Sequence, residues 1–94
     1  NGVPKDDELA VKWYRKSAEQ GNANAQFNLG VSYRRGRGVP KDYVLAYMWF
    51  NLSANIGYRD AEEERSKIEK KMTSKEIGNA QRLTREWLAK HKKK

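Results

Sequence analysis

The residues best suited to bind another molecule are polar side chains spaced as on one face of an α-helix. Asn24, Asn28, Val31 and Arg35 are separated by four, three and four positions, so a helix places them in one line. Asparagine amides can bond to the backbone of an extended peptide, and Arg34 or Arg35 can hold a carboxylate in a forked pair. The pattern predicts a partner-binding surface, although a solvated helix face with two incidental amides has the same pattern.

Basic residues near the C-terminus form a second candidate site. They are Arg82, Arg85, Lys90, Lys92, Lys93 and Lys94. The other side of this segment carries Trp87 and Leu88, and the combination can lie on an anionic membrane or follow a phosphate backbone. Acids at Glu76 and Glu86 weaken the positive field. We therefore favour a helix with a soluble basic end over a site for nucleic acid or membrane.

The sequence predicts no catalytic residue, no metal site and no cofactor. It has no cysteine, and its single histidine, His91, stands in a run of lysines with no acid beside it. The consecutive acids at 62–64 radiate around a helix and do not converge. In the loop RRGRG, residues 34–38, the glycines are better explained as turn residues than as an anion cradle. We expect a binding protein and not an enzyme.

Net charge and hydropathy indicate which kinds of partner the chain can bind, but they do not identify one. Residues 1–61 hold nine basic and six acidic residues and residues 62–94 hold eleven and six, which gives the net charge of +8. A basic balance permits association with nucleic acid, an anionic membrane or an acidic protein. No apolar run approaches the roughly 20 residues that cross a bilayer, and the N-terminal residues lack the blocks of a signal peptide. Cytoplasm and periplasm both fit this composition.

Helices must position these residues, and capping residues and glycines predict where each helix begins and ends. We expect a first helix that starts behind the capping acids Asp6 and Asp7 and stops at Gly21. A second helix should run from about Asn22 to the glycines at 36–38, and it carries the candidate surface.

Three further helices are expected. One lies between Asp42 and Gly57, and a mostly solvated one covers 60–72. The last follows a capping box of Thr73 and Glu76. The core stripes of the first and third helices are Leu9, Ala10, Trp13, Tyr14, Ser17 and Ala18, and Leu45, Ala46, Trp49, Phe50, Ser53 and Ala54. Glycine costs about 1 kcal/mol in a helix, so Gly30 predicts the close approach of another helix backbone.

The first and third helices belong to an internal repeat. GVPKD occurs at 2–6 and again at 38–42, and twelve of the 24 positions compared between 2–25 and 38–61 are identical. A repeat of this length cannot bury its apolar face alone and must stack on a neighbour. The pattern predicts an all-α fold: an α/α superhelix, or solenoid, of helix pairs with a C-terminal capping helix.

The segment AQFNLGVSYRRGRGVPKDY at 25–43, followed by AYMWF and later ANIG, resembles the Sel-1-like repeat. The resemblance covers residues 2–61 and implies a right-handed superhelix related to tetratricopeptide repeats, acting as a scaffold or adaptor, commonly in bacteria. It divides the chain into 1–61, with one partial and one complete repeat, and 62–94, with a degenerate repeat helix and the basic capping helix. In the tetratricopeptide class, an asparagine at the position of Asn28 resembles groove residues that hold a peptide terminus.

We expect a scaffold that binds a partner peptide or protein on the inner helix face. Two alternatives stay open, which are a basic module for nucleic acid or anionic membranes and a purely structural cap of a larger solenoid. The sequence starts inside a repeat, so we expect it to be the C-terminal piece of a longer chain. Trp13 and Tyr14 then lose a neighbour, which would let the exposed first helix self-associate.

Overall fold

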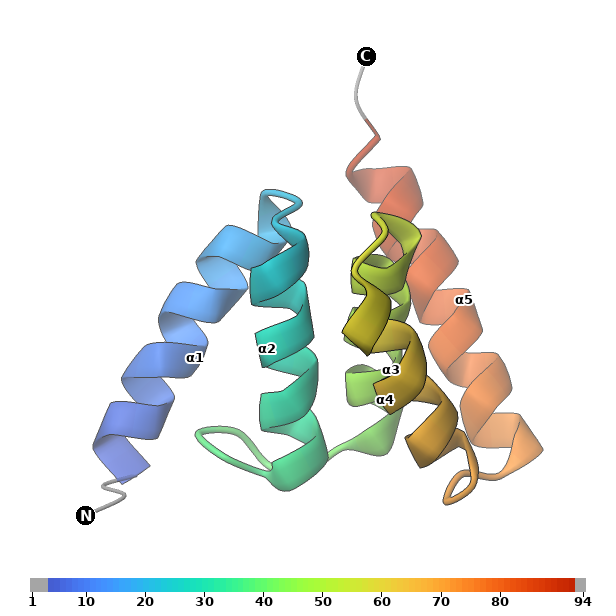
Figure 1. Ribbon diagram of the computed structural model, residues 1–94, viewed down its shortest axis with the longest axis horizontal. Coiled ribbons are helices and arrows are strands. Elements are labelled where there is room, and N and C mark those ends of the chain that lie inside the picture. Colours follow the sequence, from blue (N-terminus) through green and yellow to red (C-terminus); the bar gives the residue numbers. More distant parts are fainter. Residues whose placement is uncertain (1–3, 93–94) are drawn as a thin grey trace.

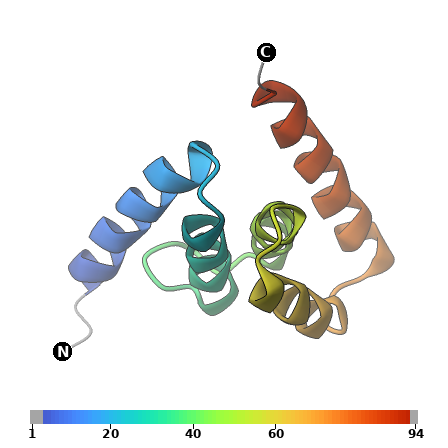
Figure 2. The ribbon, with the colours of Figure 1, turned by 45° about the horizontal axis from the view of Figure 1, so that its top comes forward.

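A computed structural model describes residues 4–92 and contains, over that range, five α-helices and no strand (Figure 1). The helices are α1 (Pro4–Glu19), α2 (Ala23–Arg35), α3 (Tyr43–Asn55), α4 (Arg59–Glu69) and α5 (Ser74–Lys90). Consecutive helices run in opposite directions, and α1 and α5 form the two outer flanks (Figure 2). The prediction of an all-α array of helix pairs is confirmed.

Side-chain caps set the helix starts largely as predicted. The carboxamide of Asn22 accepts from the amide of Ala25 at 2.8 Å, and Asp42 caps α3 in the same way at 3.0 Å. Thr73 and Glu76 form the predicted capping box, with both reciprocal bonds present.

The start of α1 was predicted wrongly. The helix begins at Pro4, and Asp6 and Asp7 lie in its first turn instead of capping it. Proline suits a first turn because the amide hydrogen that it lacks would have had no partner there. The acids are still favourable in this place, since they lie near the positive end of the helix dipole.

The core is built around α3, which packs against α2, α4 and α5. Its apolar side chains point in nearly all directions, a pattern typical of a helix enclosed by others. Phe50, Leu52 and Trp49 are almost fully buried. Because α3 is covered on several sides, it fixes where the surface helices can lie.

The reason for Gly30 differs from the prediction. A Cβ atom built at Gly30 would lie 2.6 Å from the ring of Phe50, so the glycine makes room for an aromatic side chain and not for a helix backbone. The sequence pattern located the close contact but could not say what fills it.

Part of the predicted stripe of α1 lies outside the core. Leu9 is 54% exposed and Trp13 is 62% exposed, whereas Val11, which the stripe omitted, is buried. The repeat equivalent of Trp13 is Trp49, which is 2% exposed. The two tryptophans differ because α1 packs mainly on α2 alone, while α3 has three helical neighbours.

The contact between Gly30 and Phe50 leads to a stability prediction. Gly30→Ala should lower the free energy of unfolding by about 1–3 kcal/mol, because the new methyl group overlaps the Phe50 ring. Gly78→Ala on α5 is the matched control, since no atom lies within 4 Å of its added Cβ, and it should raise stability by up to about 1 kcal/mol. Urea unfolding followed by circular dichroism measures both, and a Gly30→Ala chain as stable as the original would contradict the packing argument.

Candidate functional site

At the N-terminal end of α2, Asn24 and Asn28 form a chain of hydrogen bonds with Tyr58. We call these three residues the amide ladder. The side-chain amide of Asn24 donates to the Tyr58 hydroxyl at 3.1 Å, and the side-chain amide of Asn28 donates to Asn24 Oδ1 at 3.0 Å. Asn24 is exposed and Asn28 is half-buried. The two predicted asparagines are thus oriented by each other and by the residue that precedes α4.

Aromatic packing holds the ladder in place. The ring centroid of Tyr58 lies 5.0 Å from that of Phe27, and the Phe27 centroid lies 5.6 Å from that of Phe50 in the core. Tilted contacts at these distances are favourable for aromatic pairs. The amides of the surface are therefore connected to the core through two ring contacts.

The middle of the α2 surface borders a hollow, here called the α1–α2 cleft, of about 170 Å³. Its lining residues are Asp7, Ala10, Tyr14, Asn28, Val31, Ser32 and Arg37. Arg37 and Asp7 face each other at 3.7 Å across it, in a partly exposed ion pair. Val31 supplies an apolar wall beside the Asn28 amide.

The lower end of α2 opens on a larger hollow, here called the basic pocket, of about 530 Å³. Its lining residues are Arg34, Arg35, Lys41, Tyr43, Glu64, Lys67, Ile68 and Lys71. Residues from α2, α4 and the loop before α3 meet here. Four of the five predicted residues are thus divided between two hollows, since Asn28 and Val31 line the cleft and Arg34 and Arg35 line the basic pocket, whereas Asn24 lines neither.

The two arginines of α2 have different surroundings. The Nε atom of Arg34 lies 3.3 Å from a carboxylate oxygen of Glu64, and the other oxygen of Glu64 lies 3.4 Å from Lys67. Arg34 therefore links α2 to α4. Arg35 is exposed and makes no ion pair with the residues that the structure describes. Of the two, Arg35 is the one available to a carboxylate from outside.

The C-terminal basic residues lie on and just after α5, whose apolar side is covered at Ala80 and Trp87 but leaves Leu88 39% exposed. Ala80 is fully buried, and the Trp87 ring meets the Trp49 ring edge-on at 5.9 Å. Arg82 pairs with Glu86 at 2.9 Å, and Arg85, Lys90 and Lys92 are exposed. Lys93 and Lys94 lie outside the described residues. A membrane-surface helix would need this apolar side free.

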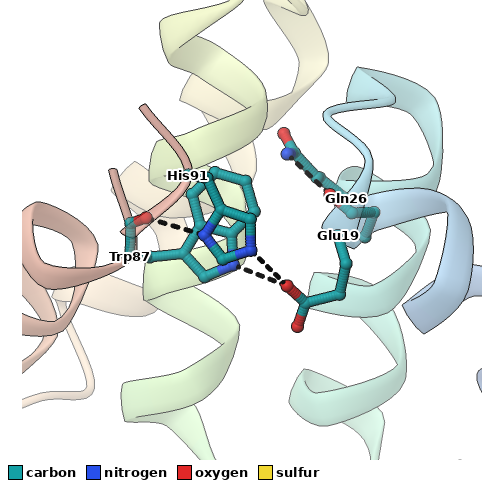
Figure 3. Close-up of polar contacts among 5 residues, drawn as sticks. Glu19, Gln26, Trp87 and His91 are labelled. Carbon is teal, nitrogen blue, oxygen red and sulfur yellow. Dashed lines mark hydrogen bonds and ion pairs between the residues drawn. The ribbon is translucent and has the colours of Figure 1, made fainter. Parts of the chain in front are cut away.

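A cluster at the ends of α1 and α5 was not predicted. Glu19 Oε1 lies 2.8 Å from His91 Nε2 and accepts from the Trp87 indole at 3.2 Å, and the His91 and Trp87 rings stack at 3.7 Å (Figure 3). We call this contact the terminal clasp. The sequence placed no acid near His91, and nothing in it indicates Glu19, because the two residues meet only through the fold.

One buried amide near the clasp and one perturbed tyrosine have structural roles. Gln26 is fully buried and donates to the carbonyl of Ala18 at 3.2 Å, at the end of α1 (Figure 3). Burial raises the pKa of Tyr47, and its 2.6 Å hydrogen bond to Glu69 and the charge of that carboxylate add to the effect. The neutral phenol holds α4 on α3.

The described part of the chain contains neither a cluster of metal-binding side chains nor a helix that could span a membrane. Within it, no group of three or more histidine, cysteine, aspartate or glutamate side chains is placed to hold a metal ion. No helix there has the length and apolar character needed to span a bilayer. What the arrangement offers is a polar helix face between two hollows.

Comparisons with known proteins agree with this architecture. The Sel1 repeat model matches residues 1–22 and 23–58, and no curated protein matches the chain. A solved structure that matches is that of c5321, a protective antigen present in uropathogenic Escherichia coli strains and displaying an SLR fold. It is 39% identical with a TM-score of 0.86, and the match covers 93% of this chain but 19% of that one. The chain thus spans about a fifth of that protein's length, and it belongs to the Sel1 repeat family.

Proposed function

We propose that this chain is a protein-interaction scaffold that binds a segment of a partner protein on α2, the inner helix of the repeat, along the face that points away from α3. Sel1 repeats are in general protein–protein interaction modules. The observation that carries the proposal is the position of Asn24, Asn28 and Arg35 on one face of α2, between the α1–α2 cleft and the basic pocket. The Escherichia coli neighbour supports the expectation of a bacterial source.

The geometry of this face suits an extended peptide. Asn24 and Arg35 are eleven positions apart, which is about 16 Å along a helix, or the length of about five residues of extended chain. Amides at the upper end can bond to a peptide backbone, Val31 offers an apolar contact, and Arg35 offers a charge at the lower end. Such a role needs no reacting group, and we assign the chain no catalysis.

A purely structural role is the second candidate, and the terminal clasp favours it. Glu19, Trp87 and His91 join the last turn of α5 to the end of α1, so α5 holds the first helix as well as covering α3. In this role the residues 62–94 close the stack of helix pairs and contact no partner.

Self-association is a further proposal for the exposed face of α1. Leu9 and Trp13 are both large, apolar and more than half exposed, and such patches mark contact surfaces when they are contiguous. A second copy of this chain offers the same patch, so a symmetric pair would bury both tryptophans.

Partner capture tests the scaffold role. At about 150 mM salt, bacterial lysate passed over the immobilised chain should yield a discrete protein, and Asn24→Ala/Asn28→Ala should reduce its capture about fivefold or more, because each lost hydrogen bond contributes about 1 kcal/mol. Lys90→Ala/Lys92→Ala, which changes exposed basic residues of the C-terminal segment, should not. Capture of nucleic acid that disappears with the lysine changes would instead support the basic-module alternative.

Stability separates the capping role from the binding role. Trp87→Ala should lower the free energy of unfolding by about 2–3 kcal/mol, since it removes the contact with Trp49 and the clasp, whereas Leu88→Ala on the exposed side should lower it by less than about 1 kcal/mol. Urea unfolding measures both. If Trp87→Ala is no more costly than Leu88→Ala, α5 is not a cap.

Sedimentation equilibrium tests self-association. The chain should show a concentration-dependent mass with a dissociation constant of about 100 µM, and Leu9→Glu/Trp13→Glu should keep it monomeric by placing like charges in the contact. Leu88→Glu, a change of an exposed apolar residue elsewhere, is the control and should leave the mass unchanged. A monomer at all concentrations would refute the symmetric pair.

A further inference from the structure

We infer that the basic pocket binds an acidic segment of the partner protein, with consecutive glutamate or aspartate side chains. The inference rests on the proposed function, because it names the chemistry of the partner that lies along α2. The pocket is the largest of the hollows described above, and nothing in the family match assigns it a ligand.

The basic pocket has a large excess of positive charge. Its wall contains five cationic side chains, from Arg34, Arg35, Lys41, Lys67 and Lys71, and one carboxylate, that of Glu64. This carboxylate is engaged by Arg34 and Lys67 together. Arg35, Lys41 and Lys71 are exposed and form no ion pair with the residues between 4 and 92. Three cations are therefore free to receive carboxylates.

The environment of these cations explains how they can gather without a bound anion. Arg34 and Arg35 lie in the last turn of α2, and Lys67 and Lys71 lie at the end of α4, where the helix dipole is negative and favours positive side chains. The Lys41 ammonium lies 5.0 Å from the centre of the Tyr43 ring, which attracts it. The pocket is thus a stable collection of charges with unused hydrogen-bond donors.

The shape of the pocket favours side chains over a bare inorganic anion. Ile68, which is 3% exposed, and the ring of Tyr43 provide an apolar part of the wall, and the cations surround it. A glutamate side chain suits this wall, because its methylene groups can contact the Tyr43 ring while its carboxylate reaches a cation at the rim. A phosphate ion has no apolar part to bury.

The same wall disfavours nucleic acid. Single-stranded nucleic acids are held by free aromatic faces for stacking and by a track of cations along the backbone. Here the Lys41 ammonium lies over the Tyr43 ring, so this face is not open for a base to stack on. Arg35 belongs both to the pocket and to the line on α2, so an extended peptide on α2 reaches the pocket with one end.

The first test is an NMR titration of the ¹⁵N-labelled chain with a blocked hexa-glutamate peptide at about 50 mM salt. The amides of residues 34–43 and 64–71 should shift with saturating behaviour, because they surround the pocket. Hexa-glutamine at the same concentration should leave them unchanged. Shifts spread over α5 instead, or equal shifts with hexa-glutamine, would overturn the assignment.

A matched pair of charge reversals separates the pocket from the net charge. Arg35→Glu/Lys71→Glu should weaken hexa-glutamate binding at least tenfold. Lys75→Glu/Arg85→Glu, which changes the net charge equally at two exposed positions on α5, should weaken it less than about threefold. All four residues make no ion pair in the described chain, so both variants should keep the original circular dichroism spectrum. An equal loss in both variants would overturn the pocket as the site.

Three further outcomes separate the pocket assignment from the scaffold proposal. A hexathymidylate that binds the same amides more tightly than hexa-glutamate would overturn the assignment to an acidic protein segment. If hexa-glutamate fails to bind while Asn24→Ala/Asn28→Ala still reduces partner capture, the scaffold proposal stands and the acidic partner is refuted. If hexa-glutamate binds at the pocket but no protein is captured, the pocket assignment stands and the scaffold proposal fails.

Discussion

Burial of α3 is the constraint on which the rest of the structure depends. Its side chains are apolar in nearly every direction, so it is stable in water only when other helices enclose it, and α2, α4 and α5 do so. Phe50 sets how near α2 can approach, because its ring occupies the space that Gly30 leaves open. The other helices need to bury one side each, which leaves them a polar side to present to water or to a partner.

The orientation of α2 follows from that enclosure. Gly30 faces Phe50 of α3, whereas Asn24 and Arg35 are exposed. On one side α1 packs on α2, and on the other side α4, which packs on α3, is joined to α2 by Arg34 and Glu64. Each flank leaves a hollow of different chemistry. The cleft on the α1 side contains one acid and one base, Asp7 and Arg37, which form an ion pair. The pocket on the α4 side contains five cations, most of them at the C-terminal ends of α2 and α4. One packing arrangement therefore supplies both parts of the candidate surface.

Local signals made the helices predictable, and long-range contacts made parts of the site unpredictable. Caps such as Asp42 and Thr73 act within three residues, so the sequence places them well. The meeting of Glu19 with His91 depends instead on how four intervening helices stack, and no local pattern records it. The candidate line on α2 was predicted from helical spacing, but its division between two hollows depends on the positions of α1 and α4. Whether those residues bind a partner stays a prediction.

Burial in a repeat array is a property of the neighbours as much as of the residue. Trp13 and Trp49 occupy equivalent positions of the repeat, yet one lies at the surface and the other in the core, because α3 has helices on several sides and α1 packs mainly on α2.

The candidate surface depends on its neighbouring helices in the same way. The cleft exists only while α1 stays on α2. Packing on α2, the ion pair of Asp7 with Arg37 and the bonds of the clasp hold α1 there, and the exposed polar contacts contribute little individually. The basic pocket lies on the better anchored side, since α4 packs on the enclosed helix α3 and is tied to α2 through Arg34 and Glu64. A partner that uses both hollows must therefore stabilise the α1 side while it finds the α4 side already in place.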